Sequence, residues 1–407
     1  MKVVFITALT LLVLATALST GWEVLYRVVY TLAGLLVVSF LWSWINVRWL
    51  WFHHEIKTTR SQVGGQIEER LTLENTGWVP KLWLELRDHS TLVGRHGNRV
   101  VGLGSYSKRT LPLITPCRVR GLYTLGPINV VSGDPFGLFK MQRKLPIGGT
   151  VVVYPAITEL TSFGRPPGEL PGGSVQAQRT HFTTPNAAGV REYQPGDALG
   201  RIHWLSSARQ RRLMVKEFDL DPLSDVWIIL DLDGEVQVGS GEDSTEEWTA
   251  SVGATLAKYF LDQQREVGIV TQGRVLVADR GYRQLQKALE LLAVAHAHSS
   301  IPLERVVLSE EVRFRRGATA VIVTPSTDER WLAACRLLAA RGVSVLAVLL
   351  EASTFGAKQS SLLLVSSLAA GGVPTFLVKR GDDLAQALAH PAGGHHNTPS
   401  PSGRRLG

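Results

Sequence analysis

The sequence predicts a multidomain membrane-anchored chain with two N-terminal transmembrane helices, a small all-β sandwich-like domain and a C-terminal open α/β sheet. Three observations support this fold class. Two apolar runs without charged residues lie near the N-terminus, short segments with a two-residue period follow to about residue 160, and from residue 225 apolar segments alternate with amphipathic ones. These patterns are typical of membrane-spanning helices, half-buried strands and strand–helix units, respectively.

Length and composition limit the function classes. The chain has 407 residues, enough for two or three domains, and 43 Lys+Arg against 35 Asp+Glu give a net charge of +8. A moderately basic surface suits contact with nucleic acid or anionic lipid. Cys117 and Cys335 lie far apart in different expected domains, and no Cys/His spacing of the metal-binding type is present. We therefore expect reduced thiols and neither a disulfide framework nor a zinc site.

Residues 1–55 are expected to form a transmembrane hairpin. Residues 3–22 and 28–47 contain no charged side chain, and each run is long enough to cross a bilayer core of about 30 Å. The connection over residues 23–27 is too short for a domain, so the two spans would be antiparallel. The end of the second run is rich in tryptophan, as at a membrane interface: Trp42, Trp44, Trp49 and Trp51.

Flanking charges predict the orientation of this hairpin. Lys2 precedes the first span, and Arg48, Lys57 and Arg60 follow the second. The positive-inside rule then places both the N-terminus and the long C-terminal body in the cytoplasm, in a multi-pass protein of the plasma membrane. A secretory signal peptide is the alternative for the first run, because residues 15–17 resemble a cleavage site. That alternative keeps the second span as the anchor.

Residues 56–160 are expected to form the β domain. Residues 66–75 alternate outward charge with inward Ile67, Leu71 and Leu73. Further short strands are expected at residues 83–86, 100–101, 123–125, 128–131 and 151–154, separated by turn formers. Several short strands without helical stretches indicate a small sandwich or barrel.

Two segments lack apolar periodicity. Residues 161–188 are rich in Gly, Pro, Ser and Thr, and we expect a linker there. Residues 390–407 consist largely of Gly, Pro, Ser and His, which predicts a disordered tail.

The segment of residues 189–224, called here the clasp, mixes arginines with aromatic side chains. Pro195-Gly196 predicts a tight turn, and Asp197 stands where a helix N-cap is expected. In a helix that follows, Asp197, Arg201, Trp204 and Ala208 would share one face. The candidate binding residues of the clasp are Arg191, Tyr193, Asp197, Arg201, Trp204 and Arg209.

Several interpretations of the clasp are open. It joins the domains with Trp204 buried, or it presents a docking surface for another protein. A nucleic-acid footprint through Trp204 and the arginines is a further alternative, although no nucleic-acid motif accompanies it and apolar residues are interleaved. A catalytic centre has little support, because His203 and Ser206 have no acid placed to orient the histidine.

The clasp also resembles a known family. The pattern Arg191-x-Tyr193-x-Pro-Gly-Asp197, then Arg201-x-x-Trp204, then Ala-Arg209 is similar to the signature of the domain-of-unknown-function 58 (DUF58) family. Two further pieces resemble it, at residues 120–127 and 134–139. The family comprises bacterial and archaeal membrane-anchored proteins with a von Willebrand factor A-like domain. The resemblance therefore implies such a domain here.

Residues 225–389 alternate strands with helices. The run of residues 226–230 is apolar throughout, as in a strand buried on both faces, and residues 246–264 place Trp248, Val252, Leu256 and Phe260 on one helical face. This order predicts an open, mostly parallel α/β sheet. Further strands are expected at residues 267–270, 275–277, 320–323, 343–350 and 374–378, with helices at 282–295, 329–340, 360–369 and 382–388.

An acidic cluster, Asp231, Asp233 and Glu235, directly follows the first of these strands. Ligands of open α/β sheets bind at such strand ends, and carboxylate oxygens suit Mg²⁺ or Ca²⁺. A tentative metal site is thus one interpretation, with Thr324 or Asp328 as further ligands. The other is a solvated loop in which Asp231 caps backbone N–H groups. A von Willebrand A-type site would carry Asp-x-Ser-x-Ser, and this sequence keeps only its first Asp.

Three functions follow as expectations. The first is a non-enzymatic, membrane-anchored scaffold or adaptor facing the cytoplasm and contacting the lipid bilayer. The family resemblance implies a MoxR-type AAA+ ATPase and a transglutaminase-like membrane protein as partners, in protein maturation or envelope homeostasis. The alternatives are a metal-dependent enzyme or metal-binding adhesion-type domain that uses the acidic cluster, and a nucleic-acid binder; nucleic acid is not the expected partner.

Overall fold

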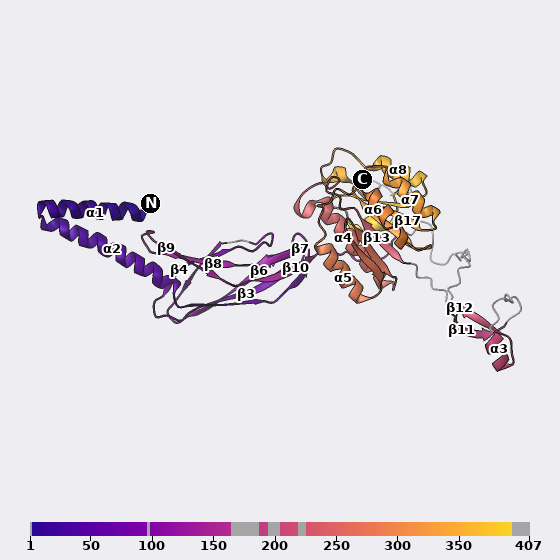
Figure 1. Ribbon diagram of the computed structural model, residues 1–407, viewed down its shortest axis with the longest axis horizontal. Helices are drawn as coiled ribbons and strands as arrows, with labels where there is room; N and C mark the ends of the chain where they lie inside the picture. Colours follow the sequence, from indigo (N-terminus) through magenta and orange to yellow (C-terminus); the bar gives the residue numbers. More distant parts are fainter. Residues whose placement is uncertain (1, 96–97, 164–186, 194–203, 219–224, 393–407) are drawn as a thin grey trace, which may run out of the picture. The chain divides into compact units, whose positions relative to one another are not determined.

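The computed structural model describes residues 2–95, 98–163, 187–193, 204–218 and 225–392. These residues form two compact units, one made of Met1–Ala156 with Leu289–Val294 and the other of Ile157–Ala288 with Ala295–Gly407 (Figure 1). The coarse prediction of two apolar helices, a mostly β region and a C-terminal α/β region is confirmed.

The first unit begins with two long helices, α1 (Lys2–Thr20) and α2 (Glu23–Val47). Both are long and apolar enough to cross a membrane, with mean hydropathies of 2.3 and 2.0. Ten strands follow: β1 (Leu50–Ile56), β2 (Arg60–Gln62), β3 (Gln66–Asn75), β4 (Lys81–Asp88), β5 (Asn98–Leu103), β6 (Lys108–Pro116), β7 (Gly121–Leu125), β8 (Ile128–Gly133), β9 (Lys140–Leu145) and β10 (Gly149–Tyr154).

These strands form three sheets, in the orders β1-β3-β6, β5-β4-β8-β9 and β2-β10-β7. The pairing is antiparallel except between β10 and β2. One core cluster combines Leu71 and Leu73 of the first sheet with Leu84, Leu86 and Val130 of the second. Ile67 joins a smaller cluster with residues of β7 and β10. The expectation that Ile67, Leu71 and Leu73 point inward is confirmed.

Helix α2 packs directly on the β strands that follow it. Only Arg48 and Trp49 separate its last residue from β1. The Lys81 ammonium donates to the carbonyl of Ile45 at 2.5 Å, where the unpaired carbonyls at a helix C-terminus favour a cation. The Ser43 hydroxyl donates to the carbonyl of Phe139 at 3.1 Å. Helix α2 and the β sheets therefore form one packed body.

The second unit contains the clasp hairpin and a six-stranded sheet. Its helices and strands are β11 (Ala187–Glu192), α3 (Trp204–Gln210), β12 (Met214–Phe218), β13 (Val226–Leu230), α4 (Thr245–Asp262), β14 (Val267–Thr271), β15 (Arg274–Asp279), α5 (Tyr282–Ala293), α6 (Leu303–Ser309), β16 (Thr319–Thr324), α7 (Trp331–Ala340), β17 (Ser344–Leu350), α8 (Leu362–Ala370), β18 (Thr375–Val378) and α9 (Leu384–Ala389).

The sheet has the order β15-β14-β13-β16-β17-β18. Strand β13 pairs in parallel with both β14 and β16, and the parallel pairing continues to β17 and β18. The exception is β15, which is antiparallel to β14 because only Gln272 and Gly273 connect them, and so few residues allow only a hairpin. Residues 226–230 are buried throughout, as expected for a central strand.

Candidate functional site

The carboxyl ends of three neighbouring strands bring together Asp231, Gln272 and Thr324. Asp231 directly follows β13, Gln272 follows β14, and Thr324 ends β16. The Thr324 hydroxyl donates to Oδ2 of Asp231 at 2.6 Å, and the Gln272 amide donates to Oδ1 at 2.8 Å. Because strand order reverses on either side of β13, this is the place where open α/β sheets bind ligands.

Backbone groups add to this network. The N–H of Asp233 donates to Oδ1 of Asp231 at 3.2 Å, and the N–H of Glu235 donates to Oδ1 of Asp233 at 3.0 Å. The Gln237 amide donates to the carbonyl of Asp231 at 2.7 Å. Each carboxylate thus caps the backbone two residues further on, which shapes the loop after β13 into consecutive Asx-type turns.

Burial and hydrogen bonding act on the Asp231 carboxyl in opposite directions. Its exposed fraction is 1 %. Burial raises its pKa, hydrogen bonds from Thr324, the Asp233 N–H and Gln272 oppose the rise, and the charge of Asp233 adds to it; the net shift is upward. Both carboxylate oxygens already accept hydrogen bonds, so Asp231 holds this loop in place through its contacts with Thr324 and Gln272.

A pocket of about 540 Å³ lies at the same edge of the sheet. Glu235, Ser326, Asp328 and Lys358 are among the residues that line it, whereas Asp231 and Asp233 are not. The Arg330 guanidinium donates to Asp328 at 2.5 Å and lowers the pKa of that carboxyl. The chain therefore places Glu235 and Asp328 on one pocket, with Asp231 outside its lining.

The tentative metal site remains a prediction. Within the described ranges, no group of three or more His, Cys, Asp and Glu side chains is arranged to hold a metal ion. Asp231 and Asp233 are buried, while Glu235 is exposed. A cation bound by all three would have to compete with the donors that the two aspartates already accept.

The clasp forms a β hairpin with a short helix at its tip. Strands β11 and β12 pair antiparallel, with Arg191 opposite Val215, and the N–H of Tyr193 donates to the carbonyl of Leu213 at 2.8 Å. The buried Ser207 hydroxyl accepts from the N–H of Met214 at 2.8 Å, which ties α3 to β12.

The structure corrects one expectation about the clasp. The interpretation in which the clasp joins the domains has Trp204 buried, but its exposed fraction is 68 %, and Ala208 and Arg209 are also exposed. Trp204 is the first residue of α3, a helix of seven residues in which Ser207 is buried. Asp197 and Arg201 lie outside the described residues, as does the predicted turn before them.

The strands β1 to β10 of the first unit are called here the β unit. They contain a buried charge cluster formed by His54, Glu69, Asp88 and Arg95. The Glu69 carboxylate pairs with His54 at 2.7 Å and with the Arg95 guanidinium, which also pairs with Asp88. The side chains of His54, Glu69 and Arg95 are 4 %, 0 % and 6 % exposed. Alternation places Glu69 on the inward face with Ile67 and Leu71, so the expectation of outward charges on this strand is wrong at Glu69, whose buried carboxylate is paired with His54 and Arg95.

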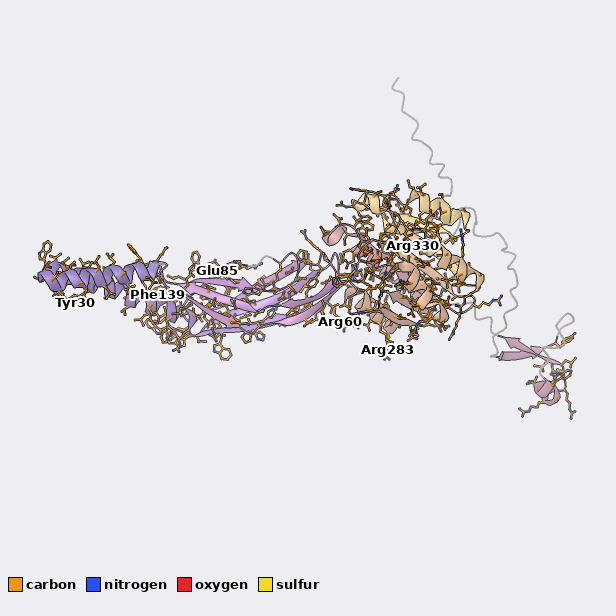
Figure 2. All side chains as sticks on the ribbon, turned by 45° about the horizontal axis from the view of Figure 1, so that its top comes forward. Tyr30, Arg60, Glu85, Phe139, Arg283 and Arg330 are labelled. Carbon is orange, nitrogen blue, oxygen red and sulfur yellow. The ribbon has the colours of Figure 1, made fainter. Side chains whose placement is uncertain are left out.

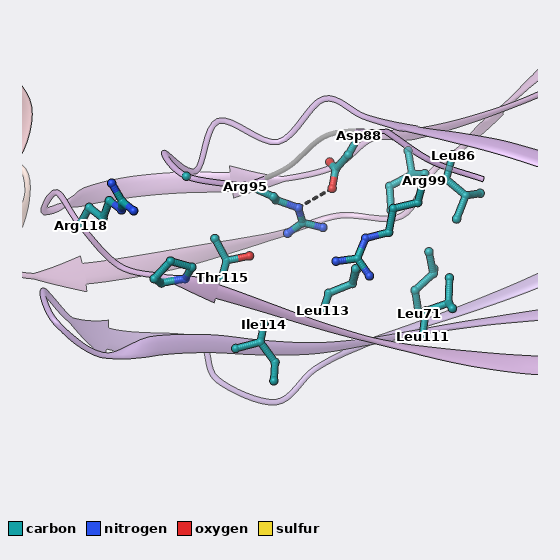
Figure 3. A pocket seen from close by; sticks show the side chains of 13 residues that line it. Leu71, Leu86, Asp88, Arg95, Arg99, Leu111, Leu113, Ile114, Thr115 and Arg118 are labelled. Carbon is teal, nitrogen blue, oxygen red and sulfur yellow. Dashed lines mark hydrogen bonds and ion pairs between the residues drawn. The ribbon is translucent and has the colours of Figure 1, made fainter. Parts of the chain in front are cut away.

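Arg95 also lines a cavity of about 260 Å³ (Figure 3). Figure 3 shows Arg95 and Arg99 projecting into this cavity among leucine side chains, with Asp88 bonded to Arg95. Salt bridges and burial hold Arg95 in one position, so the cluster connects the end of β4, at Asp88, with β3 and β1.

Two residues from the family-like pieces of the β unit are buried. Arg120 is 1 % exposed, and the nearby Tyr123 hydroxyl donates to the carbonyl of Val119 at 2.9 Å. The Asp134 carboxylate accepts from the N–H groups of Phe136 and Phe139 at 2.9 and 2.6 Å. Asp134 therefore fixes the turn between β8 and β9.

Sequence reasoning missed Gln272, Glu351 and the members of the buried charge cluster. Gln272 could have been found as the residue before Gly273 in a two-residue hairpin turn. Glu351 is buried and accepts from the Ser361 hydroxyl at 2.6 Å; burial raises its pKa, but bonds from Ser361 and Ser353 outweigh that effect and lower it. No local pattern distinguishes such residues from exposed acids.

Comparison with solved structures gives low similarity. The CARDB domain of the PF1109 protein from Pyrococcus furiosus aligns with 26 % of this chain and 91 % of that chain, at 19 % identity and a TM-score of 0.19. A beta-glucosidase from Listeria innocua aligns with 26 % of this chain and 16 % of that chain, at 12 % identity and a TM-score of 0.17. Such scores assign no fold.

Sequence comparison is more informative. The "Uncharacterized protein YeaD" of Bacillus subtilis (strain 168) is 23 % identical over 344 residues, which cover 81 % of this chain and 84 % of that protein. The model of one family matches from the start of the clasp to the segment after β17. Over residues 189–353, which include Asp231, Gln272 and Thr324, this chain is similar to the family described as "Protein of unknown function DUF58".

Proposed function

We propose that this protein is a membrane-anchored scaffold or adaptor whose body faces the cytoplasm and contacts other proteins through the clasp hairpin. The observation that carries the proposal is the exposure of Trp204 and Arg209 on a short helix at the tip of that hairpin. Tryptophan and arginine are enriched among the residues that dominate protein interfaces, and an indole exposed to 68 % on a folded hairpin is available for such contact.

Two helices support the anchoring. Helices α1 and α2 have 19 and 25 residues, enough for two spans joined by a tight turn. An even number of spans places both chain ends on one side of the bilayer. The positive charges Lys2, Arg48 and Lys57 support the cytoplasmic side.

A von Willebrand A-like arrangement of the second unit is part of the proposal. The strand that comes first along the chain lies in the middle of the sheet, the order reverses on either side of it, and β15 is the single antiparallel strand. A carboxylate, Asp231, stands directly after that first strand, and Thr324 stands after its neighbour. These features support a domain built to present a surface at this edge.

The partner class comes from the family resemblance. The resemblance to proteins with this signature implies a MoxR-type AAA+ ATPase and a transglutaminase-like membrane protein as partners. The exposed arginines of the hairpin suit a partner that presents an acidic surface.

The test is a pull-down from bacterial membranes with the tagged full-length chain, read by mass spectrometry. The Trp204→Ala/Arg209→Ala variant should lose at least one partner that the wild type retains. The matched control is Tyr282→Ala/Arg283→Ala, which removes an exposed aromatic residue and an exposed arginine elsewhere and should retain all partners. An identical partner set for all three proteins would refute the docking role of the hairpin.

Orientation has its own test. Both native cysteines, Cys117 and Cys335, are buried, and burial raises the pKa of Cys335 to about 12. A cysteine introduced at exposed Val277 should therefore be the main target of a maleimide reagent. A membrane-impermeant maleimide should modify it in inverted vesicles but not in intact cells; the opposite result would place the body outside.

A metal-dependent function is the second candidate, favoured by the position of Asp231 at the strand-order reversal. It predicts Mg²⁺ or Ca²⁺ binding that Asp231→Ala abolishes. Calorimetric titration of Mg²⁺ or Ca²⁺ into the full-length wild type and into Asp231→Ala, both in nanodiscs, distinguishes this candidate from the scaffold.

A further inference from the structure

Exposed apolar side chains, six of them aromatic and one a leucine, surround the C-terminal end of α2. Trp44 lies in the last turns of α2, Trp49 and Trp51 follow it, and Trp78, Leu82, Trp83 and Phe136 come from the β unit. We call these seven residues the aromatic collar. Trp51, Trp78 and Leu82 are 70 %, 68 % and 66 % exposed. Apolar exposure of this size around one end of a helix marks an interaction surface.

Contacts hold the turn between β8 and β9, which carries Phe136 of the collar, beside the end of α2. The rings of Phe40 and Phe139 lie 5.6 Å apart, and the Ser43 hydroxyl donates to the carbonyl of Phe139. Figure 2 shows Phe139 where α2 meets the β strands. With a rise of about 1.5 Å per residue, Phe40 lies about 10 Å before the end of the helix. The turn between β8 and β9 therefore lies beside the last turns of α2.

The length of α2 determines what surrounds those turns. Its 25 residues extend over about 37 Å, which exceeds a hydrocarbon core of about 30 Å. The excess at the C-terminal end falls in the headgroup layer, the depth at which tryptophan is enriched in membrane proteins. Residues of the β unit packed on that end share this depth.

A pocket of about 490 Å³ opens within the collar. Its lining combines Trp42, Leu82, Trp83 and Phe136 with the cation Lys140. Asn46, also in the lining, is 1 % exposed, and its Oδ1 accepts no hydrogen bond from any group in the described part of the chain. An indole-walled hollow with one basic group and one buried acceptor fits a phospholipid headgroup, which combines a phosphate with hydroxyl or ammonium donors.

Exposed basic residues flank the collar. Arg48 lies over the Trp44 ring at 4.1 Å, and β9 contributes Lys140, which lines the pocket. Cations next to an aromatic belt suit the phosphate plane of an anionic leaflet.

From these observations we propose that the aromatic collar lies in the headgroup layer of the bilayer and that its pocket holds the headgroup of a phospholipid. The proposal rests on the membrane anchoring proposed above and adds that the β unit itself enters the lipid surface. The partner is thus lipid rather than protein at this face.

The first test uses single cysteines labelled with the environment-sensitive fluorophore NBD in vesicles that contain doxyl-labelled phospholipid. Trp83→Cys and Phe136→Cys place the label on the collar. Leu122→Cys is the matched control, an exposed apolar position of the same unit on β7, which Figure 1 shows at the end of the β unit away from α2. We expect at least threefold stronger quenching at positions 83 and 136 than at 122. Equal, weak quenching at all three positions would overturn the proposal.

Vesicle flotation in the same experiment separates the two proposals. If the protein fails to float with the vesicles, the anchoring itself is wrong. If it floats and the collar labels behave like the control, only the position of the collar is wrong.

The second test addresses the pocket. Native mass spectrometry of the detergent-purified full-length protein should show retained phospholipid, reduced at least fivefold in Asn46→Leu and in Trp83→Ala. Because Asn46 is buried and its variant can fold poorly, the exposed Trp83 provides the independent variant, and Leu122→Ala is the control. Equal lipid retention in wild type and Trp83→Ala would refute a headgroup site.

Discussion

The hydroxyl of Thr324 donates a 2.6 Å hydrogen bond to Oδ2 of Asp231 and so links the ends of two neighbouring parallel strands. The carboxylate that the sequence suggested as a metal ligand thus connects the ends of neighbouring strands at the edge of the sheet. Its other oxygen accepts from Gln272 of the adjacent strand end. The consequence is that changes at Asp231 should be visible first in stability.

The first prediction concerns pH. Burial raises the pKa of Asp231 above its unfolded value of about 3.9. The folded chain then binds a proton more readily than the unfolded chain, so the wild type loses stability as pH rises between those two pKa values. Asp231→Asn cannot lose a proton there. The free energy of unfolding of the variant minus that of the wild type should increase from pH 3 upward and then level off. Denaturant unfolding in detergent at pH 3 to 7 measures it; a difference that stays constant or decreases contradicts the prediction.

The second prediction concerns divalent metal. Because the Asp231 oxygens already accept hydrogen bonds, we expect Mg²⁺ at millimolar concentration, or its removal with EDTA, to leave the unfolding midpoint of the full-length protein unchanged. A site with a Kd one hundredth of the Mg²⁺ concentration would instead stabilise the fold by about 2.7 kcal/mol. Stabilisation of that size in the wild type but not in Asp231→Ala would favour the metal-binding candidate.

The third prediction compares two tryptophans of the second unit. Trp204 is 68 % exposed, so Trp204→Ala should change the free energy of unfolding by only about 0.5 kcal/mol or less. Trp331 is 2 % exposed within the main core cluster, and Trp331→Ala should cost about 3 to 5 kcal/mol. Chemical denaturation of both variants measures the difference. A large loss for Trp204→Ala would mean that this indole is packed, as in the interpretation in which the clasp joins the domains.

The fourth prediction compares adjacent acids on β3. Glu69 is completely buried between His54 and Arg95, and Glu69→Gln removes the charge of the carboxylate that both side chains contact, which leaves Arg95 with Asp88 alone; we expect a loss of about 3 to 5 kcal/mol. Glu68 is half exposed and lies 3.7 Å from Lys57, so Glu68→Gln should cost at most about 1 kcal/mol. Equal effects in thermal or denaturant unfolding would show that the buried charge cluster does not stabilise the β unit.

Periodicity predicted the main secondary structure because burial imposes it. The uniformly apolar run that became β13 and the alternation around Leu71 and Leu73 both follow from which faces are buried. The strands β6 and β9 were missed, since β6 begins with three exposed polar residues and contains two prolines, and β9 has four polar residues among its six. Helix α6 was missed because its seven residues are too few for a helical period to appear.

The site was less predictable, because its contacts join distant parts of the chain. Asp231 could be placed at a strand end, but its bonds to Gln272 and Thr324 depend on which strands are neighbours. Glu69 shows the same limit. Alternation places it on the inward face, but a buried carboxylate is expected only when its partner is known, and Arg95 is distant along the chain.

The link between α2 and β1 has a mechanical consequence. With two residues between them and the Lys81 ammonium bonded to the carbonyl of Ile45, the β unit has little freedom to turn on its helix. If α2 spans the bilayer as proposed, any change in its tilt, for example in a bilayer of different thickness, would turn the β unit through the same angle. A change in membrane thickness would then displace the end of the β unit that lies away from α2, because the first unit moves as one rigid body.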